Sequence, residues 1–393
     1  GVLSILRSEA ITTCTPDDTK VVTCVRSLRR AGVTPDVAGD HFWGQAYWSR
    51  AAGRRIRLPH PKLGGAEYIE RINQLAPAHG WRVLLPLNDY TMDAVIRHRR
   101  QITPQLAAAV PEAEAWDLSK DKFRIAELAR NLGIGAPLSF CPASEAEALE
   151  AGRAVGYPCV IKPRRGCGAV GRVFISSPDE LLNAFRKLKP VSDAVFDFER
   201  LVVQQFIDGE PEDVCAIFRH GEPVAAYTQR KIRTWPLDGG RATVVETTHN
   251  RPLLDLGLSI MRALRWHGAI QTEFRIERSS GKPYLIDVNG RFWGALGLAV
   301  AARLDFPVLY CKLALGEDLP PAWKYPAGVR FRWPVPFALL TMLGAPHWLS
   351  TLREFFQPAP ATFSDLSWSD PAPVLAEHIF MLRRVWQRVW PAK

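Results

Sequence analysis

The stretch YPCVIKPRRGCGAVGRVF, residues 157–174, decides the fold. An apolar run that ends in Lys162 predicts a buried strand, and the loop after it contains Gly166, Gly168 and Gly171. Glycines let backbone N–H groups approach phosphate oxygens closely, and a lysine at the strand end adds a positive charge. The lysine precedes the glycines and no GK[ST] follows, so this is not the Walker pattern. The stretch therefore predicts a phosphate-binding strand and loop, with a basic surface hairpin as the alternative.

A second stretch, PYLIDVNGRFWG at residues 283–294, predicts a metal site. Asp287 and Asn289 are two apart on a predicted strand, so their side chains point to one face. A hairpin brings Glu273 beside Asp287, and Arg291 follows closely enough to reach the same anions. Three hard oxygen ligands suit Mg²⁺, which shares substrate phosphates. A polar strand end that leads into a turn is the alternative.

A third stretch, LVVQQFIDGEPEDV at residues 201–214, combines an apolar strand with a turn at Gly209. Such a segment between two lobes offers backbone groups to an adenine edge, and Glu212 offers a carboxylate to ribose hydroxyls. An ordinary strand and turn is the alternative. On its own this stretch does not predict a nucleotide site.

Strand-like and helix-like segments alternate through the first part of the chain, which predicts a parallel sheet with crossovers. No GxGxxG follows its first strand, so we expect this unit to shape a substrate site rather than to hold a dinucleotide. Longer β runs after Leu201 predict an antiparallel sheet in an α+β body.

The segment from residue 323 to the end is rich in Trp. Residues 333–352 carry no formal charge and are nearly as long as the ~20 residues that span a bilayer, but three prolines interrupt them. We therefore expect a buried or interfacial segment there. Further on, residues 371–390 predict an amphipathic helix. Its apolar face comprises Leu375, Ile379, Leu382, Trp386 and Val389. We expect this helix to dock on the body, with peripheral membrane contact as the alternative.

The composition and charge of the chain limit the classes of protein and partner that we expect. The 393 residues are 47% hydrophobic and 23% charged, as in globular proteins, and their net charge of +10 suits an anionic partner. The basic residues are dispersed without interleaved aromatic residues, so nucleic-acid binding is not expected. Seven scattered Cys without a CxxC pair argue against a disulfide framework and a Cys-rich zinc site. We expect a protein of the reducing cytoplasm.

Taken in order, these stretches resemble the ATP-grasp superfamily, and in particular its carbamoyl-phosphate-synthase-like branch. The motifs are DK (121–122), VIKPRRGCGAVG, QQFIDGEPEDV, WHGAIQTEF (266–274) and LIDVNGRFWG (285–294). The resemblance covers about residues 10–320. It implies an α/β N-terminal parallel-sheet (pre-ATP-grasp) domain, then α+β ATP-grasp domains, with a helical Trp-rich C-terminal extension outside it. The predicted units are 1–115, 116–190 (small subdomain with a Gly-rich lid), 191–322 (large subdomain with the metal site) and 323–393.

The resemblance also implies roles for particular residues. Lys122 and Lys162 would bind the ATP phosphates, and the loop from Gly166 to Gly171 would close over them. Adenine would be contacted by Gln204, by Gln205 and by the backbone of Phe206 and Ile207. The ribose would be contacted by Glu212. The metal ions, Mg²⁺ or alternatively Mn²⁺, would be held by Glu273, Asp287 and Asn289. Arg291 would stabilise the transferring phosphoryl group.

The sequence departs from the pattern of many family members at three positions. Many have Glu where Gln204 and Asp287 stand, and Pro where Gly290 stands. Aspartate still ligates Mg²⁺, so these departures affect the expected geometry of the site more than its chemistry.

The chemistry that the family implies is ATP-dependent joining of a carboxylate to an amine through an acyl phosphate. A small-molecule carboxylate needs positive charge near the metal. Basic residues flank residues 234–240, with Lys231 and Arg233 before them and Arg241 after them. The candidates for binding the carboxylate are Arg233 and Arg241. Two alternatives stay open: phosphorylation of bicarbonate, as in carboxylases and carbamoyl-phosphate-forming enzymes, and a non-catalytic ATP-binding scaffold. The sequence leaves the oligomeric state open, and a dimer is compatible with it.

Overall fold

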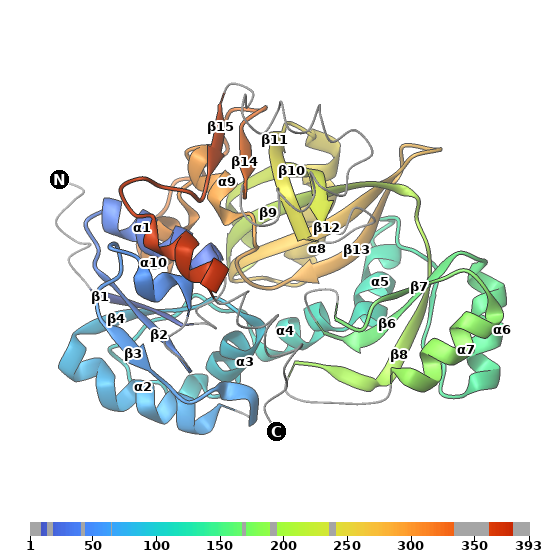
Figure 1. The fold of residues 1–393 in the computed structure, drawn as a ribbon, viewed down its shortest axis with the longest axis horizontal. Coiled ribbons are helices and arrows are strands. Elements are labelled where there is room, and N and C mark those ends of the chain that lie inside the picture. The colour runs from blue at the N-terminus through green and yellow to red at the C-terminus, as the bar shows by residue number, and fades with distance from the viewer. Residues whose placement is uncertain are drawn as a thin grey trace.

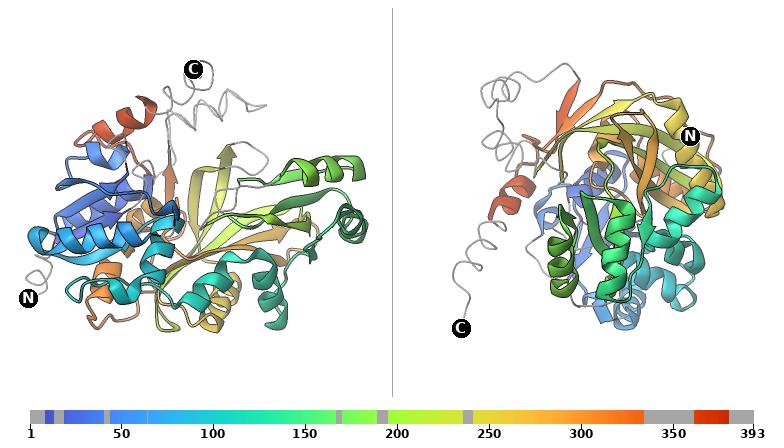
Figure 2. Two further views of the ribbon diagram at one scale, coloured as in Figure 1. Left: turned by 90° about the horizontal axis from the view of Figure 1, so that it is seen from below. Right: turned by 90° about the vertical axis from the view of Figure 1, so that its right-hand side faces the viewer.

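The computed structural model describes residues 9–13, 19–40, 44–63, 65–166, 170–188, 195–235, 241–333 and 361–379. These residues form three sheets, and the fold class predicted from the sequence, a parallel N-terminal sheet followed by an α+β body, is confirmed. Figure 1 shows the order of the elements along the chain. The left view in Figure 2 shows the N-terminal sheet and the small sheet at opposite ends of the molecule, with the large sheet between them.

The N-terminal sheet has the order β3-β2-β1-β4, and all its neighbouring strands are parallel. Its strands are β1 (Glu9–Thr13), β2 (Pro35–Gly39), β3 (Arg55–Arg57) and β4 (Trp81–Pro86). Its helices are α1 (Thr19–Arg30), α2 (Ala66–His79) and α3 (Asp89–Arg97), with short 3₁₀ turns at Gln45–Trp48, Pro61–Leu63 and Arg99–Gln101. Asn88 caps α3 by accepting a hydrogen bond from the Thr91 N–H at 2.8 Å, which fixes Asp89 in the first turn.

The small sheet is antiparallel, with the order β5-β8-β6-β7. Its strands are β5 (Ser139–Phe140), β6 (Cys159–Arg165), β7 (Val173–Ile175) and β8 (Asp197–Gln205). The helices α6 (Glu145–Val155) and α7 (Pro178–Lys187) pack beside it over a core that includes Cys159, Ile161 and Leu181. Strand β8 falls within the predicted unit 191–322, yet it pairs with β6, so the change from the small to the large sheet comes after β8.

The large sheet has seven strands in the order β13-β12-β9-β10-β11-β14-β15. They are β9 (Gly209–Arg219), β10 (Glu222–Trp235), β11 (Arg241–Thr248), β12 (Gly268–Glu277), β13 (Pro283–Asn289), β14 (Arg330–Arg332) and β15 (Thr362–Ser364). The helices of this part are α4 (Ala113–Lys120), α5 (Lys122–Asn131), α8 (Arg251–Ala263), α9 (Leu296–Ala301) and α10 (Phe306–Ala314). Buried residues of α1, such as Val25 and Leu28, share one core cluster with Tyr227, Leu298 and Phe306, which ties the N-terminal unit to the large sheet.

The C-terminal residues that the structure describes contact first the large sheet and then the N-terminal unit, beside which their helix lies in Figure 2. Strand β15 pairs with β14, and residues 372–379 are helical. The buried Asp370 carboxylate accepts hydrogen bonds from Arg26 Nε at 2.9 Å, Ser49 Oγ at 2.6 Å and the Arg50 N–H at 2.9 Å. These three bonds fix where the helix begins on the body.

The predicted docking face of this helix is wrong within residues 372–379. Leu375 and Ile379 are 61% and 58% exposed, whereas Val374, Ala376 and Glu377 are buried. The Asp370 contacts set the rotation of the helix and turn its predicted apolar stripe outward. The other members of the stripe, Leu382, Trp386 and Val389, lie outside the described residues.

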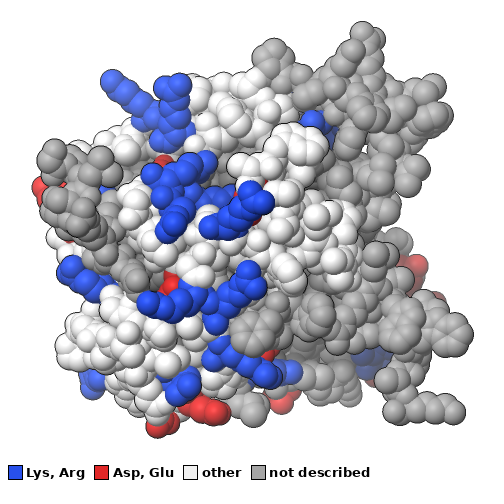
Figure 3. Space-filling model, turned by 60° about the vertical axis from the view of Figure 1, so that its left-hand side comes forward, with Lys and Arg blue, Asp and Glu red and all other residues white. Residues whose placement is uncertain are grey.

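Within the residues that the structure describes, no helix combines the length and apolar character needed to cross a membrane. After Trp333, the uncharged stretch that ends at residue 352 lies outside them. On the face that carries the N-terminal sheet, Lys and Arg side chains gather in several groups and acidic side chains are few (Figure 3). This distribution agrees with the net charge of +10.

Candidate active site

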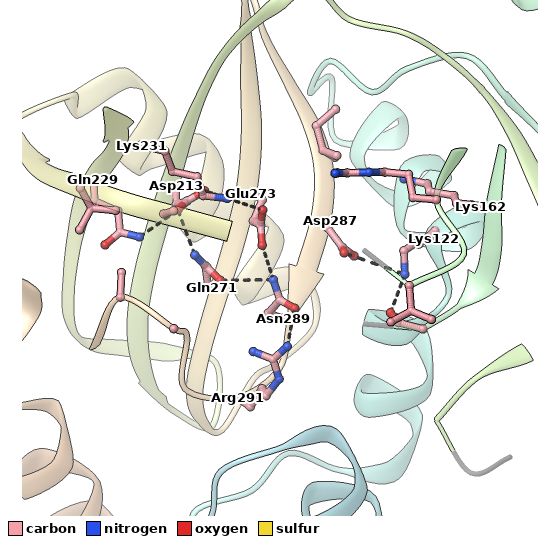
Figure 4. Close-up of a pocket in the computed structure, with 18 of the residues that line it drawn as sticks. Lys122, Lys162, Asp213, Gln229, Lys231, Gln271, Glu273, Asp287, Asn289 and Arg291 are labelled. Atoms are coloured by element: carbon pink, nitrogen blue, oxygen red, sulfur yellow. Dashed lines mark hydrogen bonds and ion pairs between the residues drawn. The ribbon is translucent and has the colours of Figure 1, made fainter. Parts of the chain in front are cut away.

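A row of polar side chains crosses four neighbouring strands of the large sheet. Gln229 on β10, Asp213 on β9, Glu273 on β12 and Asp287 on β13 are directly opposed Cα partners in the ladder. Directly opposed residues share one face of a sheet, so this row presents its side chains together. All four line one cavity of about 400 Å³ (Figure 4).

Two buried lysines form the opposite wall of this cavity. Lys122, at the start of α5, donates a hydrogen bond to Gly166 O at 2.8 Å, and its Nζ lies 3.9 Å from Asp287 Oδ2. Asp121 caps α5 by accepting from the Phe123 and Arg124 N–H groups, which places Lys122 at the cavity. Lys162 comes from β6 and is 6% exposed. Both lysines line the same cavity as the predicted metal ligands, and their contact with ATP phosphates stays a prediction.

Lys162 is a cation without a close counter-ion. Burial lowers the pKa of Lys162 to about 8, although Asp287 favours its charged form. Among the described residues, no hydrogen-bond or ion-pair partner contacts its ammonium group. An ammonium in such a place is stabilised by an anion that enters the cavity.

The predicted metal ligands lie on two paired strands, with Glu273 in the middle of β12 and with Asp287 and Asn289 at the end of β13. Glu273 Oε1 accepts a hydrogen bond from Asn289 Nδ2 at 2.7 Å, and Glu273 Oε2 accepts one from Lys231 Nζ at 2.9 Å. Burial alone raises the pKa of Glu273, but Lys231 and the bond from Asn289 outweigh it and hold that pKa below its ordinary value. Glu273 is therefore ionised at neutral pH, as a ligand for a hard cation must be.

Arg291 is held from two sides. Its Nη2 donates to Asn289 Oδ1 at 3.2 Å, and its Nε donates to Asp89 Oδ2 at 2.7 Å. Asp89 also pairs with Lys120 and is 3% exposed. Burial would raise the pKa of Asp89, but Arg291 and Lys120 hold it well below its ordinary value. Asp89 belongs to the N-terminal unit, so that unit orients Arg291. No pattern in the sequence indicates this contact.

Asp213 is the acidic residue that sequence reasoning missed. It is fully buried, and its Oδ2 accepts hydrogen bonds from Gln229 Nε2 at 2.9 Å and Gln271 Nε2 at 3.0 Å. Its Oδ1 has no hydrogen-bond partner among the described residues. Burial raises the pKa of Asp213 to about 6. Spacing of two residues predicts that Gln229 with Lys231, and Gln271 with Glu273, share a strand face, but it does not select Asp213 over Glu212.

The residues predicted at adenine do not line this cavity. Gln204 donates a hydrogen bond to Ser139 Oγ at 2.8 Å, and the Gln205 N–H donates to Leu138 O at 2.8 Å. In the connection from β8 to β9, the Phe206 ring lies edge-on to Phe174, and Ile207 O accepts from Arg275 at 3.3 Å. The adenine contacts of this segment stay a prediction.

Glu212, predicted at ribose, is directed away from the cavity. Its two oxygens accept hydrogen bonds from Thr248 Oγ1 at 2.7 Å and Asn250 Nδ2 at 2.9 Å. Successive residues of a strand point to opposite faces, so Asp213 faces the cavity and Glu212 faces helix α8, which Asn250 caps. The contact of Glu212 with ribose stays a prediction.

The glycine-rich loop approaches the cavity at Gly166. Gly166 has a φ of 155°, and a Cβ there would lie 2.9 Å from Phe196 Cδ1. Gly171 has a φ of 72°, and its Cβ would lie 2.5 Å from Phe198 Cε1. Both positions therefore require glycine. Gly168 lies outside the described residues.

Neither of the two arginines predicted to bind the substrate carboxylate is among the described residues that line the cavity. Arg233 lies on β10 and is not among the described residues that line it. Arg241 begins β11, and its side chain lies outside the described set. Lys231, two residues before Arg233, does line the cavity.

Residues 119–295 match a family model described as an ATP-grasp domain. This chain carries an ATP-grasp domain. The match begins just before α5 and ends just after Arg291, so it spans both walls of the cavity. The resemblance of the motifs to this superfamily is thereby confirmed.

Several solved structures share the fold of this chain. The biotin carboxylase domain of Hydrogenobacter thermophilus 2-oxoglutarate carboxylase, solved with MgADP and bicarbonate, is 14% identical with a TM-score of 0.66, over 82% of this chain and 73% of that one. N5-carboxyaminoimidazole synthetase of Staphylococcus aureus, complexed with ADP, is 11% identical with a TM-score of 0.62, over 82% and 80%. L-amino acid ligase of Bacillus licheniformis is 16% identical with a TM-score of 0.58, over 78% and 74%.

Proposed function

We propose that this chain is an ATP- and Mg²⁺-dependent ligase that joins a small-molecule carboxylate to an amine, forming an amide or peptide bond. The observation that carries the proposal is one cavity in which Lys122 and Lys162 face Glu273, Asp287 and Asn289. Its volume, about 400 Å³, lies in the range of roughly 300–1,000 Å³ that small-molecule sites occupy.

The cavity suits the phosphate groups of a nucleoside triphosphate. Lys122 and Lys162 supply positive charge to its phosphates, and the backbone near Gly166 approaches without a side chain in the way. The buried ammonium of Lys162, which has no counter-ion within the described part of the chain, is stabilised when phosphate oxygens enter. We assign the adenine to the connection from Gln204 to Ile207.

The oxygen ligands fit Mg²⁺. Glu273, Asp287 and Asn289 offer carboxylate and amide oxygens on two adjacent strands, which is the donor set that this ion prefers. The ion, when bound, neutralises charge on the phosphate oxygens. Mn²⁺ takes the same ligands.

The reaction needs positioning and charge stabilisation more than covalent chemistry by the protein. An oxygen of the substrate carboxylate attacks the γ-phosphorus of ATP, and the bond to the β-phosphate breaks to release ADP. Arg291, oriented by Asp89, stabilises the charge on the transferring group. The amine then attacks the acyl phosphate, loses a proton and displaces phosphate. We propose Arg233 and Arg241 as the residues that hold the substrate carboxylate.

One comparison favours a second candidate reaction. The biotin carboxylase domain described above was solved with bicarbonate, so bicarbonate is a carboxylate-like substrate to include in the test. The same domain is a dimer by its description. We propose a cytoplasmic protein and a dimer here as well, and sedimentation of the full chain measures the assembly.

The decisive experiment measures phosphate release by the full chain with MgATP and pools of carboxylates crossed with pools of amines. We expect release only when both are present, and none from Asp287→Ala, which should fold normally. Release with bicarbonate alone would favour the carboxylase-type reaction. Tight ATP binding without release from any pool would favour a scaffold and contradict the proposal.

A further inference from the structure

An ammonium group lies inside the carboxylate cluster of the site. Lys231 Nζ is 2.9 Å from Glu273 Oε2 and 3.9 Å from Asp213 Oδ1 (Figure 4). The side chain of Lys231 is 19% exposed, and that of Asp213 is 0% exposed. Lys231 therefore lies where a cation would contact two carboxylates at once.

The second carboxylate has no other cation near it. Asp213 Oδ2 accepts from two neutral amides, Gln229 and Gln271, and Oδ1 accepts no hydrogen bond from a described residue. A buried carboxylate without a counter-ion costs several kcal/mol. Within the described part of the chain, Lys231 is the only basic side chain within ion-pair distance of Asp213.

We propose that the ammonium group of Lys231 is a built-in cation of this site, which takes the place of a second divalent ion beside Glu273 and Asp213, so that the chain binds one Mg²⁺ with its nucleotide. This inference rests on the proposed function. It assigns Asp213 and Lys231 to the metal centre as a pair.

The charges beside Lys231 agree with this assignment. Asp213 and Glu273 share one ammonium group, that of Lys231. Asp287 pairs with a different cation, Lys122, at 3.9 Å. A second divalent ion at Glu273 and Asp213 would lie beside the Lys231 ammonium and be repelled by it.

The occupied lone pairs limit the room at Glu273. A carboxylate offers about four acceptor sites, and Glu273 uses one on each oxygen, for Lys231 and for Asn289. One acceptor site on each oxygen remains for a metal ion. A second ion at Asp213 would have to occupy the position of the Lys231 ammonium, and β10 fixes that position between β9 and β11.

The test counts bound ions rather than turnover. The full chain is saturated with the non-hydrolysable analogue adenosine 5′-(β,γ-imido)triphosphate and titrated with Mn²⁺, and free Mn²⁺ is followed by electron paramagnetic resonance. We expect one Mn²⁺ per chain for the wild type and two for Lys231→Met. Two Mn²⁺ in the wild type would overturn this proposal and leave the proposed function intact. Failure of the wild type to bind the analogue would overturn both.

Two further measurements guard against a variant that folds poorly. Without nucleotide, Mn²⁺ should raise the melting temperature of Lys231→Met more than that of the wild type, because the ion replaces the missing ammonium. The double variant Lys231→Met/Asp213→Asn loses the cation and the carboxylate together, so it should regain stability and bind one Mn²⁺. If Lys231→Met binds one ion and gains no extra stabilisation, or if the double variant binds two, the proposal is wrong.

Discussion

At the scale of the residue, Lys162 shows how burial prepares a side chain for a ligand. A lysine that folding removes from water prefers its neutral form, and the pKa of Lys162 falls to about 8. Folding is therefore less favourable while this lysine is protonated. The unfolding free energy should increase as the pH rises from about 8 towards the ordinary lysine value of 10.5.

The same shift predicts how nucleotide binding depends on pH. Phosphates bind the protonated lysine, and the free protein loses this proton as the pH rises through about 8. Above that pH, the affinity for MgATP should fall by about tenfold per pH unit. Lys162→Arg keeps its charge, so its affinity should change less from pH 7 to pH 10. Calorimetry on both proteins measures the difference, and parallel profiles would contradict the assignment.

Asp89 makes a second prediction at this scale. Asp89→Asn weakens the contact that orients Arg291 and should lower kcat by about 10²-fold with little change in KM for ATP, since small misplacements of a catalytic group have this effect. Asp36→Asn is the matched control, because Asp36 is as buried and bonds Arg54 and Trp81 in the same unit. Both variants should lower the melting temperature, and only Asp89→Asn should slow turnover. Equal kcat values would show that Asp89 is merely structural.

At the scale of the element, strand alternation explains what the sequence could and could not predict. Asp287 and Asn289 stand two apart after an apolar run, so their shared face was readable. Asp213 lies next to Glu212 in one turn-and-strand stretch, and the sequence alone does not say which of the two faces the cavity. Only the register of β9 with β10 and β12 decides it in favour of Asp213.

The glycine-rich loop allows a test of how its backbone conformation affects nucleotide binding. Gly166→Ala would strain the backbone at a φ of 155° and would move Phe196, so the loop would shift and nucleotide affinity should fall by about tenfold or more. Gly133→Ala is the control, because Gly133 also has a positive φ, of 71°, but open space around its Cα. Calorimetric titration with the ATP analogue compares the two. Equal losses of affinity would indicate a general effect of backbone strain.

At the scale of the whole molecule, the parallel N-terminal sheet and the α+β body after it were predictable, whereas contacts between distant segments were not. Arg291 meets Asp89 across 202 positions, and Asp370 meets Arg26 across 344. No local pattern encodes such pairs, because each partner alone is an ordinary charged residue. The orientation of the C-terminal helix was mispredicted for the same reason: a polar contact at Asp370, and not the apolar stripe, determines it.

Docking of the C-terminal segment should therefore depend on Asp370. Asp370→Ala removes three hydrogen bonds to a carboxylate, at a cost of about 2 kcal/mol, and leaves Arg26, among the described residues, bonded only to the Asp365 and Asp370 carbonyls of this segment. We expect faster proteolysis after residue 360 and unchanged ATP affinity, because the contact lies away from the cavity. Leu375→Ala, at a 61% exposed position, is the control and should cleave at the wild-type rate. Equal cleavage of the wild type and Asp370→Ala would mean that other contacts hold the segment.

The most direct test of the central claim follows an oxygen atom. The carboxylate found in the pool screen is labelled with ¹⁸O and incubated with the full chain, MgATP and the amine, and the released phosphate is analysed by mass spectrometry. A ligase that attacks the γ-phosphorus with the carboxylate leaves one labelled oxygen in the phosphate, and that is the result we predict. Phosphate without label would show that water attacks ATP, which would contradict the proposed function.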